Sequence, residues 1–243
     1  MDGCARGVRP LEIKILRSMT RQAVPREVLE REILEKPLFK NKQWKVAPYP
    51  IVWSDLEKIE LQAIGRLCGK FLKGLDWMYY RLVEGKSILR KREYQPSWVL
   101  EYWERGKPES LIKKQRQKKY KGELPELVRP DLVVTANGYR MTEIEVVPGG
   151  LGLIGNMYKA YEKYGYAGGL ERLLNGFKAT LDTKNKKAGV VVSEESETYR
   201  PEWQWVCERL GVACVKPEDV NGLERIYRFF ELFDLENIAN VEL

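Results

Sequence analysis

The sequence predicts an α/β protein with a helical N-terminal region, a β-hairpin, and a Rossmann-like parallel βαβ portion. Three observations predict it. Helical patterns prevail in residues 1–128, an Asn-Gly pair separates two β-branched runs at 137–138, and a strand–helix–strand rhythm runs over 188–215. We therefore divide the chain into a basic N-terminal region (1–128), a segment with an acidic hairpin, a glycine-rich turn and helices (129–185), and a βαβ portion (186–243).

Composition narrows the possible classes of protein. A hydrophobic content of 44% is enough for a packed core. No run of apolar residues is long enough to span a membrane and the N-terminus has no apolar signal region, so we expect a cytoplasmic protein without a membrane partner. The chain has four cysteines without CxxC spacing and no histidine. These counts argue against zinc, haem and Ser-His or Cys-His catalysis by this chain, and indicate reduced, structural cysteines.

The N-terminal region reads as extended, proline-containing arms around a short helix at 28–34 and one long helix. Ser54 followed by Glu57 forms a capping-box pattern, which predicts a helix start. We expect this helix to end near a glycine at 69–74, and a second, aromatic-rich helical piece at 76–83 to contribute to the core. The apolar stripe predicted for the long helix comprises Leu56, Ile59, Ile64, Leu67, Cys68, Phe71 and Leu72.

Charge is unevenly distributed along the chain. Residues 1–130 carry 29 Lys and Arg against 17 Asp and Glu, whereas residues 131–243 carry 13 against 18. After a short amphipathic helix at 97–103, the run Lys113–Lys121 is the strongest nucleic-acid candidate. It is a single segment with one aromatic residue, Tyr120, so a surface helix or loop is the simpler interpretation. We do not expect a nucleic-acid partner, but we keep it as an alternative.

The hairpin around Asn137-Gly138 organises the middle of the chain, and its register decides what it displays. A two-residue turn would mix apolar and acidic side chains on one face. A three-residue loop with Gly138 left-handed instead places Asp131 opposite Glu143 and Arg129 opposite Glu145, which separates the polar from the apolar face better. The apolar face would then hold Leu132, Val134, Ile144 and Val146.

Two interpretations of the polar face remain open. Arg129 and Glu145 can form an ion pair on a solvated face, or the carboxylates of Glu143 and Glu145 can hold Mg²⁺ beside an arginine that binds an anion. The following turn, 148–152, has three glycines that let backbone N–H groups approach a ligand, and a helix N-terminus follows it. No Gly-Lys-Ser/Thr follows, so this is not a Walker loop.

The C-terminal portion shows the pattern of a parallel sheet. The predicted elements are helices at 153–164 and 169–181, strands at 188–193 and 212–215, and helices at 201–210 and 220–232. A strand–helix–strand unit of this length predicts a parallel pair with a right-handed connection. Ligands of such sheets lie beyond the carboxyl ends of the strands, which makes Tyr199 and Arg200 candidate contacts, although a plain surface pair is also open.

The pattern Arg129-x-Asp131, a short hairpin, Glu143-x-Glu145 and a Gly-Gly-Leu turn resembles circularly permuted ATP-grasp ligases of the glutathione synthetase and glutathionylspermidine synthase type. The resemblance implies that Arg129 holds the substrate, that Glu143 ligates Mg²⁺, and that 148–152 cradles the amino-acid end of the substrate. The family has asparagine at the position of Glu145 and a serine-bearing loop at the turn. Residues and resemblance together give these candidates: Arg129, Asp131, Pro148, Gly149, Gly150, Leu151, Gly152, Asn156, Tyr199 and Arg200 for substrate, and Glu143 and Glu145 for metal.

The resemblance implies an ATP-dependent carboxylate–amine ligase that takes a small peptide or an amino-acid-like anion, with Mg²⁺ as cofactor. In the family, the groups that hold ATP lie mainly downstream of the segment that resembles 188–235. We therefore expect this chain to be the N-terminal half of a ligase, as a truncated form or as one subunit beside a partner chain, and to be inactive alone; no catalytic residue is assigned. A non-enzymatic ligand-binding module and a nucleic-acid-associated protein are the alternatives.

Overall fold

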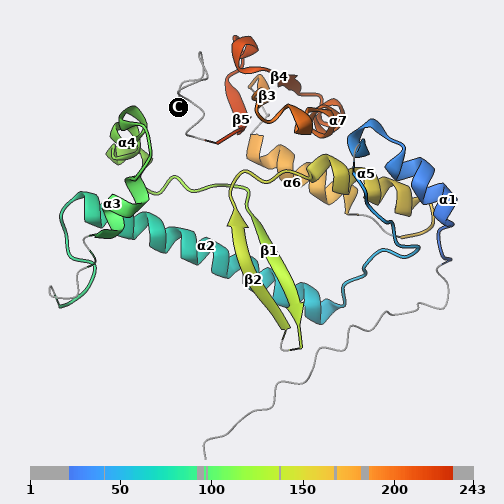
Figure 1. Ribbon diagram of the computed structural model, residues 1–243, viewed down its shortest axis with the longest axis horizontal. Helices are drawn as coiled ribbons and strands as arrows, with labels where there is room; N and C mark the ends of the chain where they lie inside the picture. Colours follow the sequence, from blue (N-terminus) through green and yellow to red (C-terminus); the bar gives the residue numbers. More distant parts are fainter. Residues whose placement is uncertain are drawn as a thin grey trace, which may run out of the picture.

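The computed structural model describes residues 22–40, 42–91, 96, 98–136, 138–166, 169–181 and 186–231. These residues form a mixed α/β fold with seven α-helices, a two-stranded antiparallel sheet and a three-stranded parallel sheet. Figure 1 shows the hairpin crossing the long helix α2. The parallel sheet lies to one side of α2, together with the helices α1, α5, α6 and α7. The arms expected before residue 22, and Cys4, lie outside the described residues.

The long helix α2 (Asp55–Val83) begins at the predicted cap. Ser54 Oγ accepts a hydrogen bond from the Glu57 backbone N–H at 3.2 Å, and the Glu57 carboxylate accepts one from the Ser54 backbone N–H at 2.7 Å. The predicted end is wrong, because the helix continues through Gly69 and Gly74. An isolated glycine costs a helix only about 1 kcal/mol, which strong helix formers on both sides offset.

The apolar stripe of α2 is largely exposed to solvent. One part of it meets the hairpin, where Cys68 Sγ lies 3.7 Å from Met141 Sδ. Trp53, just before the helix, makes an edge contact with the ring of Tyr139 in the hairpin. The large apolar side chains of α2 that remain exposed are Leu56, Ile59, Leu67, Phe71 and Trp77. We predicted that the aromatic residues of 76–83 lie in the core. This prediction is confirmed for Tyr80, which is buried, and wrong for Trp77, which is exposed.

Two short helices and a 3₁₀ turn fold onto the C-terminal part of α2. They are α3 (Trp98–Glu104), α4 (Glu109–Gln115) and η4 (Lys118–Tyr120). The basic run Lys113–Lys121 forms the end of α4 and the turn that follows it. The prediction of a surface helix or loop is confirmed.

The hairpin consists of β1 (Arg129–Thr135) and β2 (Gly138–Glu145). Its open end has the predicted pairs, Arg129 with Glu145 and Asp131 with Glu143. The predicted three-residue loop is wrong, because Thr135 pairs with Gly138 and leaves two residues between the strands. A one-residue shift between Asp131 and Leu132 then restores the predicted register. Gly138 has a φ of +88°, in the left-handed region, as predicted. The bulge, rather than the loop length, thus separates the two faces.

The C-terminal portion comprises α5 (Leu151–Glu162), α6 (Leu170–Leu181), β3 (Ala188–Val192), α7 (Arg200–Leu210), β4 (Ala213–Val215) and β5 (Arg225–Phe229). The sheet order is β4-β3-β5 and both pairs are parallel, which confirms the predicted parallel pair. The helix predicted over 220–232 is wrong, since β5 occupies its centre. Arg-Ile-Tyr-Arg-Phe is rich in β-formers, and pairing with the fully buried β3 decides for a strand.

Two buried clusters hold this portion together. The larger one packs α6 and α7 against the parallel sheet around Trp203. The smaller one joins α5 to the N-terminal helical segment, formed by α1 (Arg26–Leu29), η1 (Glu30–Leu34) and η2 (Pro37–Phe39). The expected helix at 28–34 is thus present, with a π-helical second part. Among the described residues, no helix is both long and apolar enough to cross a membrane.

Candidate functional site

The candidate residues meet where the open end of the hairpin, the glycine turn and the start of α7 come together. Arg129 Nη1 donates a hydrogen bond to the Gly149 carbonyl at 2.8 Å. A Cβ added to Gly149 would lie 3.0 Å from the ring of Tyr199 and 3.3 Å from that of Phe229, so both rings lie against the same residue. Residues 70 positions apart in the sequence therefore contact one short turn, as a common site requires.

The hairpin charges at this site are paired with each other. Arg129 forms ion pairs with Asp131, at 3.3 Å from Nε to Oδ1, and with Glu145. The structure thus contains the ion pair that was one of the two interpretations of this face. Glu143 is exposed and shares the face. Among the described residues, no three Asp, Glu or Cys side chains lie close enough to hold a metal ion.

Two carboxylates still suit Mg²⁺, which commonly takes one or two protein carboxylates and fills its shell with water and substrate oxygens. Glu143 and Glu145 offer that number. An ion bound there would compete with Arg129 for Glu145. Any metal at this face is therefore coupled to the position of the arginine.

The glycine turn is engaged by a buried carboxylate of the chain itself. Gly150 has a φ of +88° and precedes α5, and its backbone N–H donates to Glu202 Oε1 at 2.9 Å. The Glu202 side chain comes from the first turn of α7 and only 3% of the residue is exposed. Burial raises the pKa of Glu202, and backbone N–H groups of Gly150 and Leu153 offset part of the rise. The positive end of α5, expected to face a ligand, is therefore capped internally.

The remaining glycine of the turn serves helix packing. A Cβ on Gly152 would lie 2.7 Å from Glu202 Cβ and 2.8 Å from Glu202 Cα, so α5 and α7 touch closely at this point. One turn further on, a Cβ on Gly155 would lie 2.6 Å from the ring of Trp205. Only glycine permits this approach. Part of the glycine content that suggested ligand binding is thus explained by packing.

Four other predicted residues have structural contacts. Pro148 and Leu151 are buried, and Leu151 belongs to the main core. Asn156 is buried and its amide donates to the Glu32 carbonyl at 3.4 Å, which ties α5 to η1. Arg200 donates to the Val192 carbonyl at 3.0 Å and to Glu197 at 2.6 Å, so its side chain closes the end of β3.

Several buried polar atoms near the turn have no hydrogen-bond partner within the described residues. They are Glu145 Oε2, Ser193 Oγ, Glu202 Oε2, Trp203 Nε1 and Tyr227 Oη. Glu145 is ion-paired with Arg129, Ser193 directly follows β3, and the Trp203 and Tyr227 rings lie 5.3 Å apart. Buried polar atoms without partners are uncommon in folded proteins, and each calls for an explanation.

Apart from Glu145, these groups were missed in the sequence, although one signal was available. Glu202 is a carboxylate in the Glu-Trp-Gln-Trp-Val-Cys stretch of α7, where its neighbours at helical spacing are buried. A charged residue on the buried side of a helix requires a partner. The partner, a backbone N–H 52 residues earlier, is not visible from the sequence.

Cys207 and Cys214 form a pair near Arg200. A hydrogen bond with Cys207 and the charge of Arg200 lower the pKa of Cys214, while burial opposes the shift. The Cys207 thiol, as the other partner, has a raised pKa. Among the described cysteines, Cys214 is thus the one whose thiolate is favoured.

Comparison with known proteins gives no relative: no family model matches the chain, and neither the curated proteins nor the solved structures contain a significant match.

Proposed function

We propose that this chain binds a small anionic peptide or amino-acid-like substrate, as the substrate-binding portion of an ATP-dependent carboxylate–amine ligase with a Rossmann-like βαβ part. The observation that carries the proposal is that Arg129 and Tyr199 both contact Gly149 in the glycine turn. Ligands of parallel sheets commonly bind beyond the carboxyl ends of the strands, and Tyr199 lies in that region.

Each group would have a distinct role. Arg129, 43% of whose side chain is exposed, would exchange its contact with Asp131 for a substrate carboxylate, to which a guanidinium can bind in a bidentate manner. The exposed face of Tyr199 would pack against the body of the substrate. Mg²⁺ enters as a co-ligand: Glu143 and Glu145 would supply two carboxylates, and the substrate further oxygens.

The ligase chemistry implied by the resemblance is the formation of an acyl phosphate from a carboxylate and ATP, followed by attack of an amine. The groups that would bind ATP are not among the residues proposed here. The proposal for this chain is thus substrate binding.

Isothermal titration with a γ-glutamyl peptide, with and without Mg²⁺, tests the proposal. We expect binding that Arg129→Gln weakens at least tenfold, because a charge-assisted bidentate contact to a carboxylate is lost. Arg225→Gln is the matched control, since Arg225 is likewise a partly exposed arginine that forms an ion pair, in its case with Glu126. Thermal melts of both variants separate loss of binding from loss of folding. Equal binding by parent and Arg129→Gln would refute the proposed role of this site.

A non-enzymatic binding module at the same turn is the second candidate. The observation that favours it is the internal pairing, in which Glu145 engages Arg129 and Glu202 engages the Gly150 N–H. Nucleotide binding in the presence of a supplied C-terminal, ATP-binding portion distinguishes the two. A protein that binds peptide and gains no nucleotide binding with that portion fits the module.

A further inference from the structure

The positive charge of the chain is concentrated in one short segment. Residues 86–121 hold 12 Lys and Arg against 4 Asp and Glu, a net charge of +8, whereas the whole chain has +7. The structure folds residues 98–121 of this segment, which form α3, α4 and η4, onto the end of α2. A field of this sign attracts polyanions.

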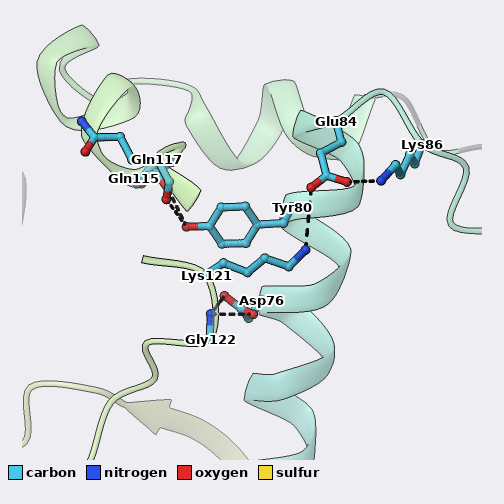
Figure 2. A network of polar contacts seen from close by, with 8 residues as sticks. All are labelled: Asp76, Tyr80, Glu84, Lys86, Gln115, Gln117, Lys121 and Gly122. Atoms are coloured by element: carbon cyan, nitrogen blue, oxygen red, sulfur yellow. Dashed lines mark hydrogen bonds and ion pairs between the residues drawn. The ribbon is translucent and has the colours of Figure 1, made fainter. Parts of the chain in front are cut away.

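The basic segment is fastened to α2 by polar contacts that Figure 2 shows from close by. Tyr80 Oη donates to the carbonyls of Gln115 and Gln117, at 2.8 and 3.2 Å. Asp76 accepts from the Gly122 backbone N–H at 3.2 Å, and Lys121 Nζ lies 3.7 Å from the Glu84 carboxylate. These anchors hold the segment in a defined position on the helix.

A cavity of about 510 Å³ lies between α2 and the basic segment. Four aromatic side chains line it: Tyr79, Tyr80, Trp103 and Tyr120. The Tyr79 hydroxyl donates a hydrogen bond to Glu104 at 2.9 Å and accepts one from the Gln115 amide at 2.5 Å. These contacts orient the Tyr79 ring, as the contacts of the Tyr80 hydroxyl orient the Tyr80 ring. Tyr80 is only 4% exposed, and Lys121 Nζ lies 5.7 Å from its ring centroid. The rings that the cavity offers to a ligand are therefore the half-buried ones of Tyr79, Trp103 and Tyr120. Its volume is within the range of small-ligand sites.

Lysines complete the cavity. Lys107 and Lys114 both line it, and neither forms an ion pair within the described residues. The carboxylate of Asp76, also in the lining, is held by the Gly122 N–H. Glu123 and Arg228 contribute one charge of each sign. Aromatic faces next to cations suit a planar, uncharged ring that is joined to an anionic group.

The same chemistry continues outside the cavity. Trp98 and Tyr102 on α3 form an edge contact, with ring centroids 6.2 Å apart, and both are more than 60% exposed. Lys113, Lys118 and Lys119 are exposed on α4 and η4. A ligand longer than one ring unit would therefore meet further lysines and a second aromatic surface.

We propose that this segment binds single-stranded nucleic acid, with one base stacked in the aromatic cavity and the adjoining phosphates on Lys107 and Lys114. Alternating aromatic and cationic groups are how single strands are held without base-specific hydrogen bonds. The site is separate from the glycine turn and does not depend on the function proposed for the turn.

Fluorescence anisotropy with a labelled dT12 oligonucleotide over a range of salt concentrations tests the proposal. We expect binding that weakens with salt, because each neutralised phosphate releases counterions, with a slope of about −0.7 per contact. The double variant Lys107→Gln/Lys114→Gln should lower the affinity by roughly tenfold or more at low salt and reduce the slope by about 1.4. Lys159→Gln/Lys178→Gln, which removes two exposed lysines of α5 and α6, is the matched control and should have a much smaller effect.

Two further measurements make the test specific. Trp103→Leu should weaken binding by about tenfold and leave the salt slope unchanged, because it removes stacking and no charge; circular dichroism checks that the variant folds. Unlabelled dTMP should compete poorly. Competition by dTMP as strong as by dT12 would overturn the proposal in favour of a mononucleotide site. Equal losses in both lysine double variants, or no binding at low salt, would also overturn it.

Discussion

Gly152→Ala tests the close contact between α5 and α7. The new Cβ would lie 2.7 Å from Glu202 Cβ and 2.8 Å from Glu202 Cα, closer than such atoms approach in folded proteins. These Glu202 atoms belong to or adjoin the backbone and cannot rotate away, so the helices must separate. Overpacking of this kind costs about 1–3 kcal/mol. Alanine returns about 1 kcal/mol of helix propensity, which leaves a net loss of about 0–2 kcal/mol.

The control is Gly176→Ala in α6, where an added Cβ meets nothing within 4 Å. There the propensity gain acts alone, and we expect stabilisation by about 0.5–1 kcal/mol. Because the propensity gain is common to both, the two variants should differ by about 1–3 kcal/mol in the free energy of unfolding, measured by urea denaturation with equal m-values. A Gly152→Ala protein stabilised like Gly176→Ala would refute the close helix contact.

Three further predictions concern titratable groups. Burial raises the pKa of Glu202, so this carboxyl binds a proton more tightly in the folded protein than in the unfolded chain. The folded protein therefore loses stability as pH rises from about 4.5 through the folded pKa. In urea melts over that pH range, Glu202→Gln should become more stable relative to the parent. A hydrogen bond from Arg116 lowers the pKa of Glu104, so the ionised carboxylate stabilises the fold above about pH 4.5 and this stabilisation is lost as pH falls. Because Arg116 is half-exposed, Glu104→Gln should lower the free energy of unfolding by only about 0.5–1 kcal/mol at pH 7, and by nothing in acid, in the same urea melts. A hydrogen bond with Cys207 and the charge of Arg200 lower the pKa of Cys214. Alkylation followed by mass spectrometry should therefore label Cys214 before the other described cysteines, and should label it more slowly in Arg200→Gln.

Each of these has an outcome that contradicts it. A constant stability difference between Glu202→Gln and the parent across pH would mean that the carboxyl titrates normally. A Glu104→Gln penalty that persists in acid would assign its effect to packing. An unchanged alkylation rate in Arg200→Gln would show that Arg200 does not influence the Cys214 thiol.

Local chemistry determined the elements that the sequence predicted correctly. The capping box at Ser54 determines where α2 starts, since the hydrogen bonds join residues three apart. The strand of β3 followed from a continuous buried run, and α7 from its helical pattern with proline in the first turn. The separation of polar from apolar residues on the hairpin predicted the Asp131–Glu143 pair.

Long-range contacts decided what the sequence predicted wrongly or not at all. Pairing with β3 made a strand of 225–229, and a bulge, rather than a longer loop, set the hairpin register. At the candidate site, Arg129, the glycine turn and Tyr199 were predicted by residue type. Their mutual contact, and the capping of Gly150 by Glu202, depend on how α7 packs on α5.

The sequence by itself determined which residues can carry charge, turn sharply or start a helix, because those properties act over a few positions. Only the tertiary structure decided that Glu202 occupies the α5 N-terminus, and that aromatic rings from α2 and α3 enclose a cavity beside the lysines. The physical reason is that burial and pairing depend on neighbours that are distant in the chain, and the same glutamate or lysine has a different role in each setting.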